Sequence, residues 1–76
     1  MDARQSRMAR GALSWTLDDL AEASGVSRRT VAKFEAGEPV GDLLQTKLKA
    51  AFEAKHVRFV EDGPFKGAMI KVRRAN

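Results

Sequence analysis

The apolar side chains of this chain recur with two different periods. From residue 2 to about residue 55 they return every three or four positions, which is the spacing of an amphipathic α-helix. Beyond residue 56 the period changes to two, and apolar residues alternate with charged or small ones, as in a β-strand. We therefore predict a single domain over residues 1–76, with a helical part at about 2–55 and a C-terminal β-hairpin at about 57–74.

Capping residues divide the helical part into four helices. Capping boxes, in which a side chain and the backbone three residues away bond each other, are predicted at Asp2 with Gln5, Thr16 with Asp19, and Asp42 with Gln45. Ser27 is a suitable N-cap for a further helix between the last two of these. Gly25 and Gly37 are placed to end the second and third helices, and Pro39 prevents the third from continuing.

Each predicted helix has one apolar face. The residues expected on these faces are Met8, Ala9, Ala12 and Leu13; Leu17, Leu20 and Ala21; Thr30, Val31 and Phe34; and Leu44, Leu48, Ala51 and Phe52. The alternating segments predict strands at Val57–Val60 and Ala68–Arg73, with Asp62, Gly63, Pro64 and Gly67 between them. Two strands alone are unstable in water, so the hairpin must pack on the helices or pair with another chain.

Composition limits the kinds of site that this chain can hold. It has 14 Lys and Arg against 10 Asp and Glu, a net charge of +4, which fits either a solvated surface or an anionic partner. It has no cysteine for a disulfide, and because His56 is its only histidine we expect no metal site and no cofactor. It has neither an apolar run of about 20 residues nor a signal peptide, so we expect a cytoplasmic protein without membrane contact.

The sequence shows no catalytic pattern. We find no Ser/His/Asp order, no metal-ligand cluster and no phosphate-binding glycine loop. Asp18 and Asp19 are adjacent on a predicted helix, where neighbouring side chains point about 100° apart. They therefore cannot face each other as a catalytic carboxylate pair, and we expect that the protein is not an enzyme.

The most informative stretch is residues 16–37, in which two short predicted helices are joined by a three-residue turn that starts at Gly25. Gly25 permits a sharp turn, and Ala21 is small enough to let the two helices approach closely. Apolar side chains fill the angle between them: Val26, Val31 and Phe34. These requirements define a helix-turn-helix unit, whose second helix enters the major groove of DNA.

This stretch resembles the helix-turn-helix domains of the Cro and phage-repressor type, also called the XRE type. The resemblance, which with the flanking helices covers about residues 4–55, is carried by Leu20-Ala21, Gly25-Val26-Ser27, Thr30-Val31 and Phe34-Glu35-Ala36-Gly37. It implies a mainly α fold: a four-helix repressor-like domain, with the β-hairpin in place of the fifth helix that the family often has. It also implies double-stranded DNA as the partner.

The resemblance implies roles for particular side chains. Those at base-contacting positions are Arg28, Arg29 and Lys33, which can donate to guanine. From periodicity alone the same cations fit a solvated helix face. Those placed to contact phosphates are Thr16, Ser27 and Thr30. Arg10 and Glu35 match a structural pair that links the first helix to the end of the third, although the sequence alone also fits two unpaired surface charges.

Two positions depart from the family pattern. The family commonly has Gln at the first position of its second helix, where Leu17 stands and cannot bond a phosphate. After the third helix the family often carries basic or amide residues, whereas this chain has Glu38, which repels a phosphate. Both changes lower the expected affinity for the phosphate backbone of DNA.

We expect a sequence-specific homodimeric repressor that reads the major groove with the helix at 27–36. The edge strand Ala68–Arg73 is expected to pair across a two-fold axis, with Met69, Ile70 and Val72 at the dimer interface. The basic residues of this segment fit either edge protection or phosphate contact: Lys66, Lys71, Arg73 and Arg74.

An alternative function belongs to another class. The chain also fits a helix-turn-helix protein-interaction module, or an antitoxin-like autoregulator, with weak or no DNA binding of its own. In either case the chain has no room for a separate sensing domain, so we expect no small-molecule ligand.

Overall fold

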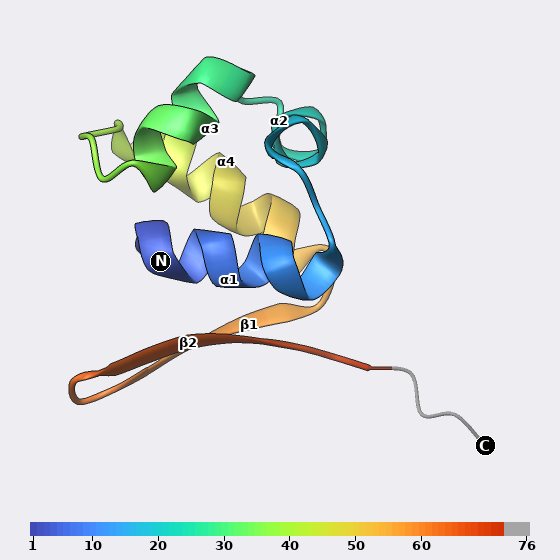
Figure 1. Ribbon diagram of the computed structural model, residues 1–76, viewed down its shortest axis with the longest axis vertical. Coiled ribbons are helices and arrows are strands. Elements are labelled where there is room, and N and C mark those ends of the chain that lie inside the picture. The colour runs from blue at the N-terminus through green and yellow to red at the C-terminus, as the bar shows by residue number, and fades with distance from the viewer. Residues whose placement is uncertain (73–76) are drawn as a thin grey trace.

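Four helices precede a two-stranded antiparallel hairpin, as the sequence predicts (Figure 1). The computed structural model describes residues 1–72. The elements are α1 (Ala3–Leu13), α2 (Leu17–Ser24), α3 (Arg28–Glu35), α4 (Asp42–Glu53), β1 (Val57–Asp62) and β2 (Phe65–Ile70). The mainly α class with a C-terminal hairpin is therefore confirmed.

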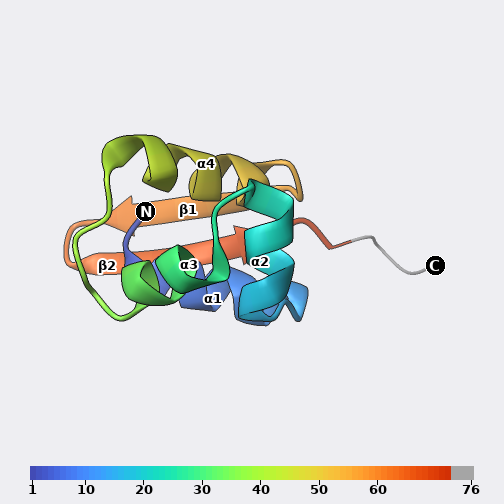
Figure 2. The ribbon, with the colours of Figure 1, turned by 90° about the horizontal axis from the view of Figure 1, so that it is seen from above.

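The helices all lie on one face of the hairpin (Figures 1 and 2). α1 rests on the sheet and contacts mainly β2, whereas α4 contacts β1. α3 lies on the far side of α1 from the hairpin (Figure 1). One surface of α3 is therefore free to face away from the sheet.

Local capping starts the first three helices where the sequence predicts. The Asp2 side chain accepts from the backbone N–H of Gln5, and Gln5 Oε1 accepts from the N–H of Asp2, both at 2.9 Å. Thr16 is the N-cap of α2 and exchanges the same two hydrogen bonds with Asp19. Ser27 is the N-cap of α3. Each cap satisfies N–H groups that a helix start would otherwise leave unpaired.

The third predicted capping box, Asp42 with Gln45, is wrong. Gly41 is the N-cap of α4 and makes no side-chain bond, so Asp42 already lies within the first helical turn. Gln45 instead reaches back past the cap, and its Nε2 donates to the carbonyl of Val40 at 2.7 Å. The helix begins one residue early because Gly41 supplies the extended conformation of the cap.

Two of the turns use the left-handed backbone that glycine adopts without strain. Gly25 ends α2 at φ 75°, and Gly37 follows α3 at φ 86°, as the sequence predicts. His56, which follows α4, also has a positive φ of 62°. It turns the chain from α4 into β1.

The core lies between the helices and the inner face of β1. Its buried apolar members are Ala9, Leu20, Val26, Val31, Phe34, Leu48, Ala51, Phe52 and Val57. The Phe52 ring stacks on Trp15 and meets the edge of Phe59, with 5.8 Å between ring centroids in each pair. The hairpin thus packs on the helices through an aromatic cluster.

The inner face of α1 differs from the predicted one. Met8 and Ala12 are exposed, whereas Gln5 and Ser6 are fully buried beside Ala9. Gln5 Nε2 donates to the carbonyls of Val60 and Gly67, at 3.2 and 3.1 Å, so one amide bonds both strands. Buried polar groups are tolerated when such hydrogen bonds satisfy them. Because this buried face includes polar side chains, the apolar periodicity of the sequence does not indicate it.

The hairpin strands are longer than predicted at the turn. Only Gly63 and Pro64 separate them, and the register pairs Asp62 with Phe65 and Val57 with Ile70. Gly67, predicted as part of the loop, lies inside β2. The left-handed backbone of Gly63, at φ 58°, permits this tight turn. The predicted strand end at Arg73 lies outside the described residues.

Candidate nucleic-acid interface

α3 is anchored by one face and exposes the other. Val31, Phe34 and Glu35 are buried against the rest of the domain. The cations predicted to contact bases are all exposed: Arg28, Arg29 and Lys33. The buried face fixes α3 in the domain, and the exposed face presents positive charge to solvent.

The three cations do not share one environment. Arg28 forms an ion pair with Asp18 on α2, with 3.0 Å between Nε and Oδ1. Arg29 and Lys33 have no ion-pair partner among residues 1–72. Sequence reasoning missed Asp18, because its pairing depends on how α2 and α3 cross.

The hydroxyl groups predicted to contact phosphates already make hydrogen bonds within the protein. Thr16 Oγ1 accepts from the N–H of Asp19 at 3.1 Å, and the first turn of α2 also carries Asp18. Ser27 Oγ donates to Thr30 Oγ1 at 2.9 Å. Thr16 lies beside two carboxylates, Asp18 and Asp19, which repel phosphate.

Glu35 is the centre of a network that joins α1 to the end of α3. Its carboxylate accepts from Arg10 Nε and Nη2, the shortest distance being 2.7 Å, and from Ser6 Oγ at 2.8 Å. Its backbone carbonyl accepts from Arg7. Arg10 Nη1 donates to the carbonyl of Trp15 at 3.0 Å. The hydrogen bond to Glu35 raises the pKa of Arg10, which therefore stays charged.

The two departures from the family pattern have structural consequences. Leu17 is half-buried and packs against the core, so it contributes to folding. Glu38 is exposed three residues after the end of α3, where it adds negative charge near the C-terminal end of that helix. Neither side chain can bond a phosphate.

The residues predicted at a dimer interface lie in different surroundings. The Ile70 side chain packs against the core, whereas Met69 is 51% exposed and Val72 is 74% exposed. Lys66 pairs with Asp2 at 3.3 Å and with Glu61 at 3.5 Å, so it connects β2 to the start of α1. Lys71 is exposed. The two arginines of this basic segment, Arg73 and Arg74, lie outside the described residues.

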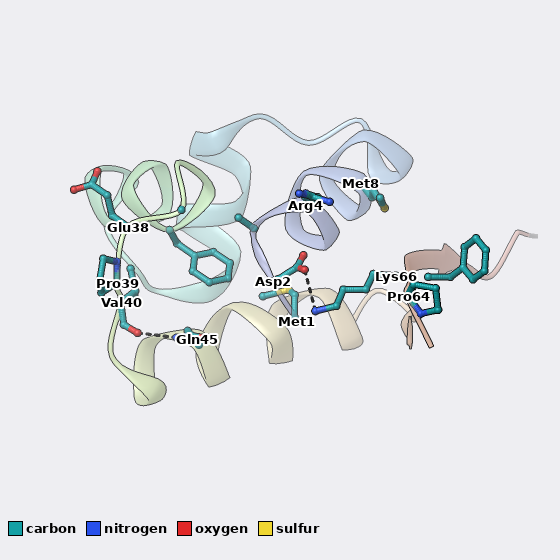
Figure 3. Close-up of a pocket in the computed structure, with 14 residues that line it drawn as sticks. Met1, Asp2, Arg4, Met8, Glu38, Pro39, Val40, Gln45, Pro64 and Lys66 are labelled. Atoms are coloured by element: carbon teal, nitrogen blue, oxygen red, sulfur yellow. Dashed lines mark hydrogen bonds and ion pairs between the residues drawn. The ribbon is translucent and has the colours of Figure 1, made fainter. Parts of the chain in front are cut away.

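A hollow opens between the start of α1, the α3–α4 loop and the hairpin turn (Figure 3). The Asp2–Lys66 ion pair crosses it. None of the residues of α2 and α3 predicted to contact bases or phosphates, nor their caps Thr16 and Ser27, lines this hollow. Among the described residues, no group of His, Cys, Asp and Glu side chains is arranged to hold a metal ion. Residues 1–72 also contain no helix long and apolar enough to span a membrane.

Comparison with protein families matches residues 7–51, more than half of the chain, to a helix-turn-helix family. No curated protein matches the chain. The match runs from within α1 to near the end of α4, and therefore includes the Gly25 turn and the cationic face of α3. The chain belongs to the helix-turn-helix family of the Cro and phage-repressor (XRE) type, a family of DNA-binding regulators and not of enzymes.

Proposed function

We propose that the chain is a cytoplasmic, homodimeric repressor that binds a specific DNA sequence through α3. One observation carries the proposal: α3 is fixed by its buried face and exposes Arg28, Arg29 and Lys33. A rigid helix with cations on its free face fits the major groove, whose width admits an α-helix.

Base recognition follows from the chemistry of these side chains. An arginine can donate two hydrogen bonds to O6 and N7 of guanine, and a lysine can donate to the same edge. We therefore propose that Arg28, Arg29 and Lys33 contact guanine-containing base pairs. Ser27 and Thr30, at the start of α3, are proposed to contact phosphates, with Thr16 contributing less because of its acidic neighbours.

The outer edge of β2 is suited to pair with a second copy. The N–H of Lys71 donates to the carbonyl of His56, and hydrogen-bonded pairs alternate along an antiparallel ladder. The backbone groups of Lys66, Ala68 and Ile70 therefore point away from β1. Met69 and Val72 add exposed apolar surface near this edge. Ile70 contributes its backbone, because its side chain packs inward.

Pairing along this edge keeps both helical layers on the same side of the joined sheet. An antiparallel strand pair has its two-fold axis normal to the sheet, and all helices lie on one face of the hairpin. Both copies of α3 then face the same way, as binding in successive major grooves about 34 Å apart requires. A dimer formed through the outer sheet face would instead direct the two α3 helices apart.

Selection of bound sequences from a random DNA pool tests the proposal. A palindromic motif with guanine in each half-site is expected, together with affinity that falls steeply as salt rises. Arg28→Ala plus Arg29→Ala should abolish selection. The matched control is Lys47→Ala plus Lys49→Ala, which removes two exposed charges from α4. Sedimentation showing only monomer at micromolar concentration would exclude the dimer.

The outer face of the hairpin favours a second candidate function, a protein-interaction module. Phe65 is 72% exposed and Met69 is 51% exposed. Alternation along β2 places both side chains on the face opposite that of Ala68 and Ile70, which pack against the core. Large exposed apolar side chains that cluster indicate an interaction surface. Absence of DNA binding at low salt, with the protein folded, would favour this function over the repressor.

A further inference from the structure

Asp18 on α2 and Arg28 on α3 form an ion pair across the helix-turn-helix unit. The distance from Arg28 Nε to Asp18 Oδ1 is 3.0 Å, and the side chains are 63% and 77% exposed. The pair therefore lies at the surface and is accessible to a ligand. An exposed ion pair adds little to folding stability, so a role in folding does not explain it well.

The shortest contact of the pair is made through Nε of the guanidinium. The two terminal nitrogens of Arg28, Nη1 and Nη2, donate no hydrogen bond to any of residues 1–72. These nitrogens form a planar fork with two parallel donors, which is the arrangement that guanine O6 and N7 accept. The carboxylate can thus hold the arginine while leaving the fork open.

Restraint of Arg28 by Asp18 affects binding because an exposed arginine otherwise samples many rotamers. A side chain that is already ordered loses less conformational entropy when it binds, so its contact with the matching base is strengthened. The negative charge of Asp18 also opposes nearby phosphates, which lowers binding that does not depend on sequence. Both effects increase the ratio of specific to non-specific affinity.

We propose that Asp18 is a positioning residue for Arg28 and thereby a determinant of DNA sequence specificity. The proposal rests on the proposed function, since it requires Arg28 to contact a guanine. It makes Asp18 act through Arg28 and not by contacting DNA itself.

Two charge-matched variants separate positioning from simple electrostatics. Asp18→Asn and Glu22→Gln each remove one negative charge from α2, and Glu22 lies one helical turn after Asp18 on the same face. Glu22 has no ion-pair partner among the described residues. Both variants should therefore bind non-specific DNA more tightly, by similar factors.

Only the Asp18 variants should change the selected sequence. In selection from a random pool, Asp18→Asn and Asp18→Ala are expected to weaken the guanine preference at one position of each half-site by about two- to fivefold. Glu22→Gln should leave that preference unchanged. In the Arg28→Ala background, Asp18→Ala should have no further effect on base preference, because the residue that it positions is gone.

The outcomes distinguish this proposal from the proposed function. If the wild-type chain selects a motif and Asp18→Ala selects it with the same guanine preference, the positioning role is overturned and DNA recognition stands. If the folded wild-type chain selects no sequence, the proposed function fails and the positioning role fails with it. Circular dichroism and thermal unfolding of each variant establish that it folds.

Discussion

The guanidinium of Arg10 and the carboxylate of Glu35 form a bidentate ion pair between α1 and the last residue of α3, with 2.7 Å between Nη2 and Oε1. The Glu35 side chain is 5% exposed and that of Arg10 is 21% exposed, so most of the pair is shielded from water. Because Glu35 belongs to α3 itself, the network sets the orientation of the helix that carries the exposed cations.

Removal of Glu35 alone should destabilise the domain strongly. Glu35→Ala leaves Nε and Nη2 of Arg10 and the Ser6 hydroxyl without their acceptor, and loss of one partner of a buried pair costs about 3–5 kcal/mol. The single tryptophan, Trp15, packs on Phe52, so its fluorescence can follow unfolding in urea. Replacing both partners, as Arg10→Met with Glu35→Leu, should cost less than Glu35→Ala. A double variant that is less stable than the single one would contradict this account.

Gln5 is expected to hold the hairpin against α1. Gln5→Ala removes the reciprocal cap of α1 and both bonds to the strand carbonyls, with an expected loss of about 1–3 kcal/mol. Amide hydrogen exchange in β1 and β2 should quicken more than in α2. The control is Arg4→Ala, a change at a neighbouring exposed position of α1. Equal exchange in the two variants would show that Gln5 does not connect the layers.

Asp2 should make stability depend on acid pH. The backbone N–H of Gln5 bonds its carboxylate and lowers the pKa of Asp2, and Lys66 lowers that pKa further. The folded state therefore binds the Asp2 proton more weakly than the unfolded state. The stabilisation that Asp2 contributes is complete at pH values above the pKa that Asp2 has in the unfolded chain, near pH 4. It is lost as the pH falls through the lower pKa that Asp2 has in the folded protein.

Thermal unfolding across this range measures the effect. Asp2→Ala should cost about 1 kcal/mol at neutral pH, and the difference from wild type should shrink as the pH falls below about 4. Asp2→Asn keeps a capping oxygen without the charge, so its own contribution should not titrate. A difference between wild type and Asp2→Ala that stays constant down to the acid transition would exclude this role of the ionised carboxylate.

Glu38 should limit the affinity of the proposed DNA complex. Glu38→Lys replaces an exposed acid just after α3 by a cation, so it should tighten binding and steepen the salt dependence by about one unit of slope. The selected motif should stay the same, because phosphate contacts do not read bases. The control is Glu53→Lys, a change at the last residue of α4. Equal effects of the two changes would indicate that only net charge matters.

Features that depend on neighbours in sequence were predictable. The caps of the first three helices and the left-handed glycines need only backbone groups within a few residues, so the residue types determine them. The cationic face of α3 follows from helical periodicity in the same way. The third capping box was predicted wrongly, because Gly41 takes the N-cap position of α4 and Asp42 is the first residue of the helix.

Other features depend on the tertiary structure. Gln5 and Ser6 look like surface residues in the sequence, but they are buried because their partners lie 55, 62 and 29 residues away. The ion pair of Asp18 with Arg28 exists because α2 and α3 cross at the Gly25 turn. The sequence by itself therefore determined the helices, the turn and the charged face, since short-range hydrogen bonds and periodicity specify these. Only the tertiary structure decided which polar side chains meet, because the packing of distant segments brings their donors and acceptors within bonding distance.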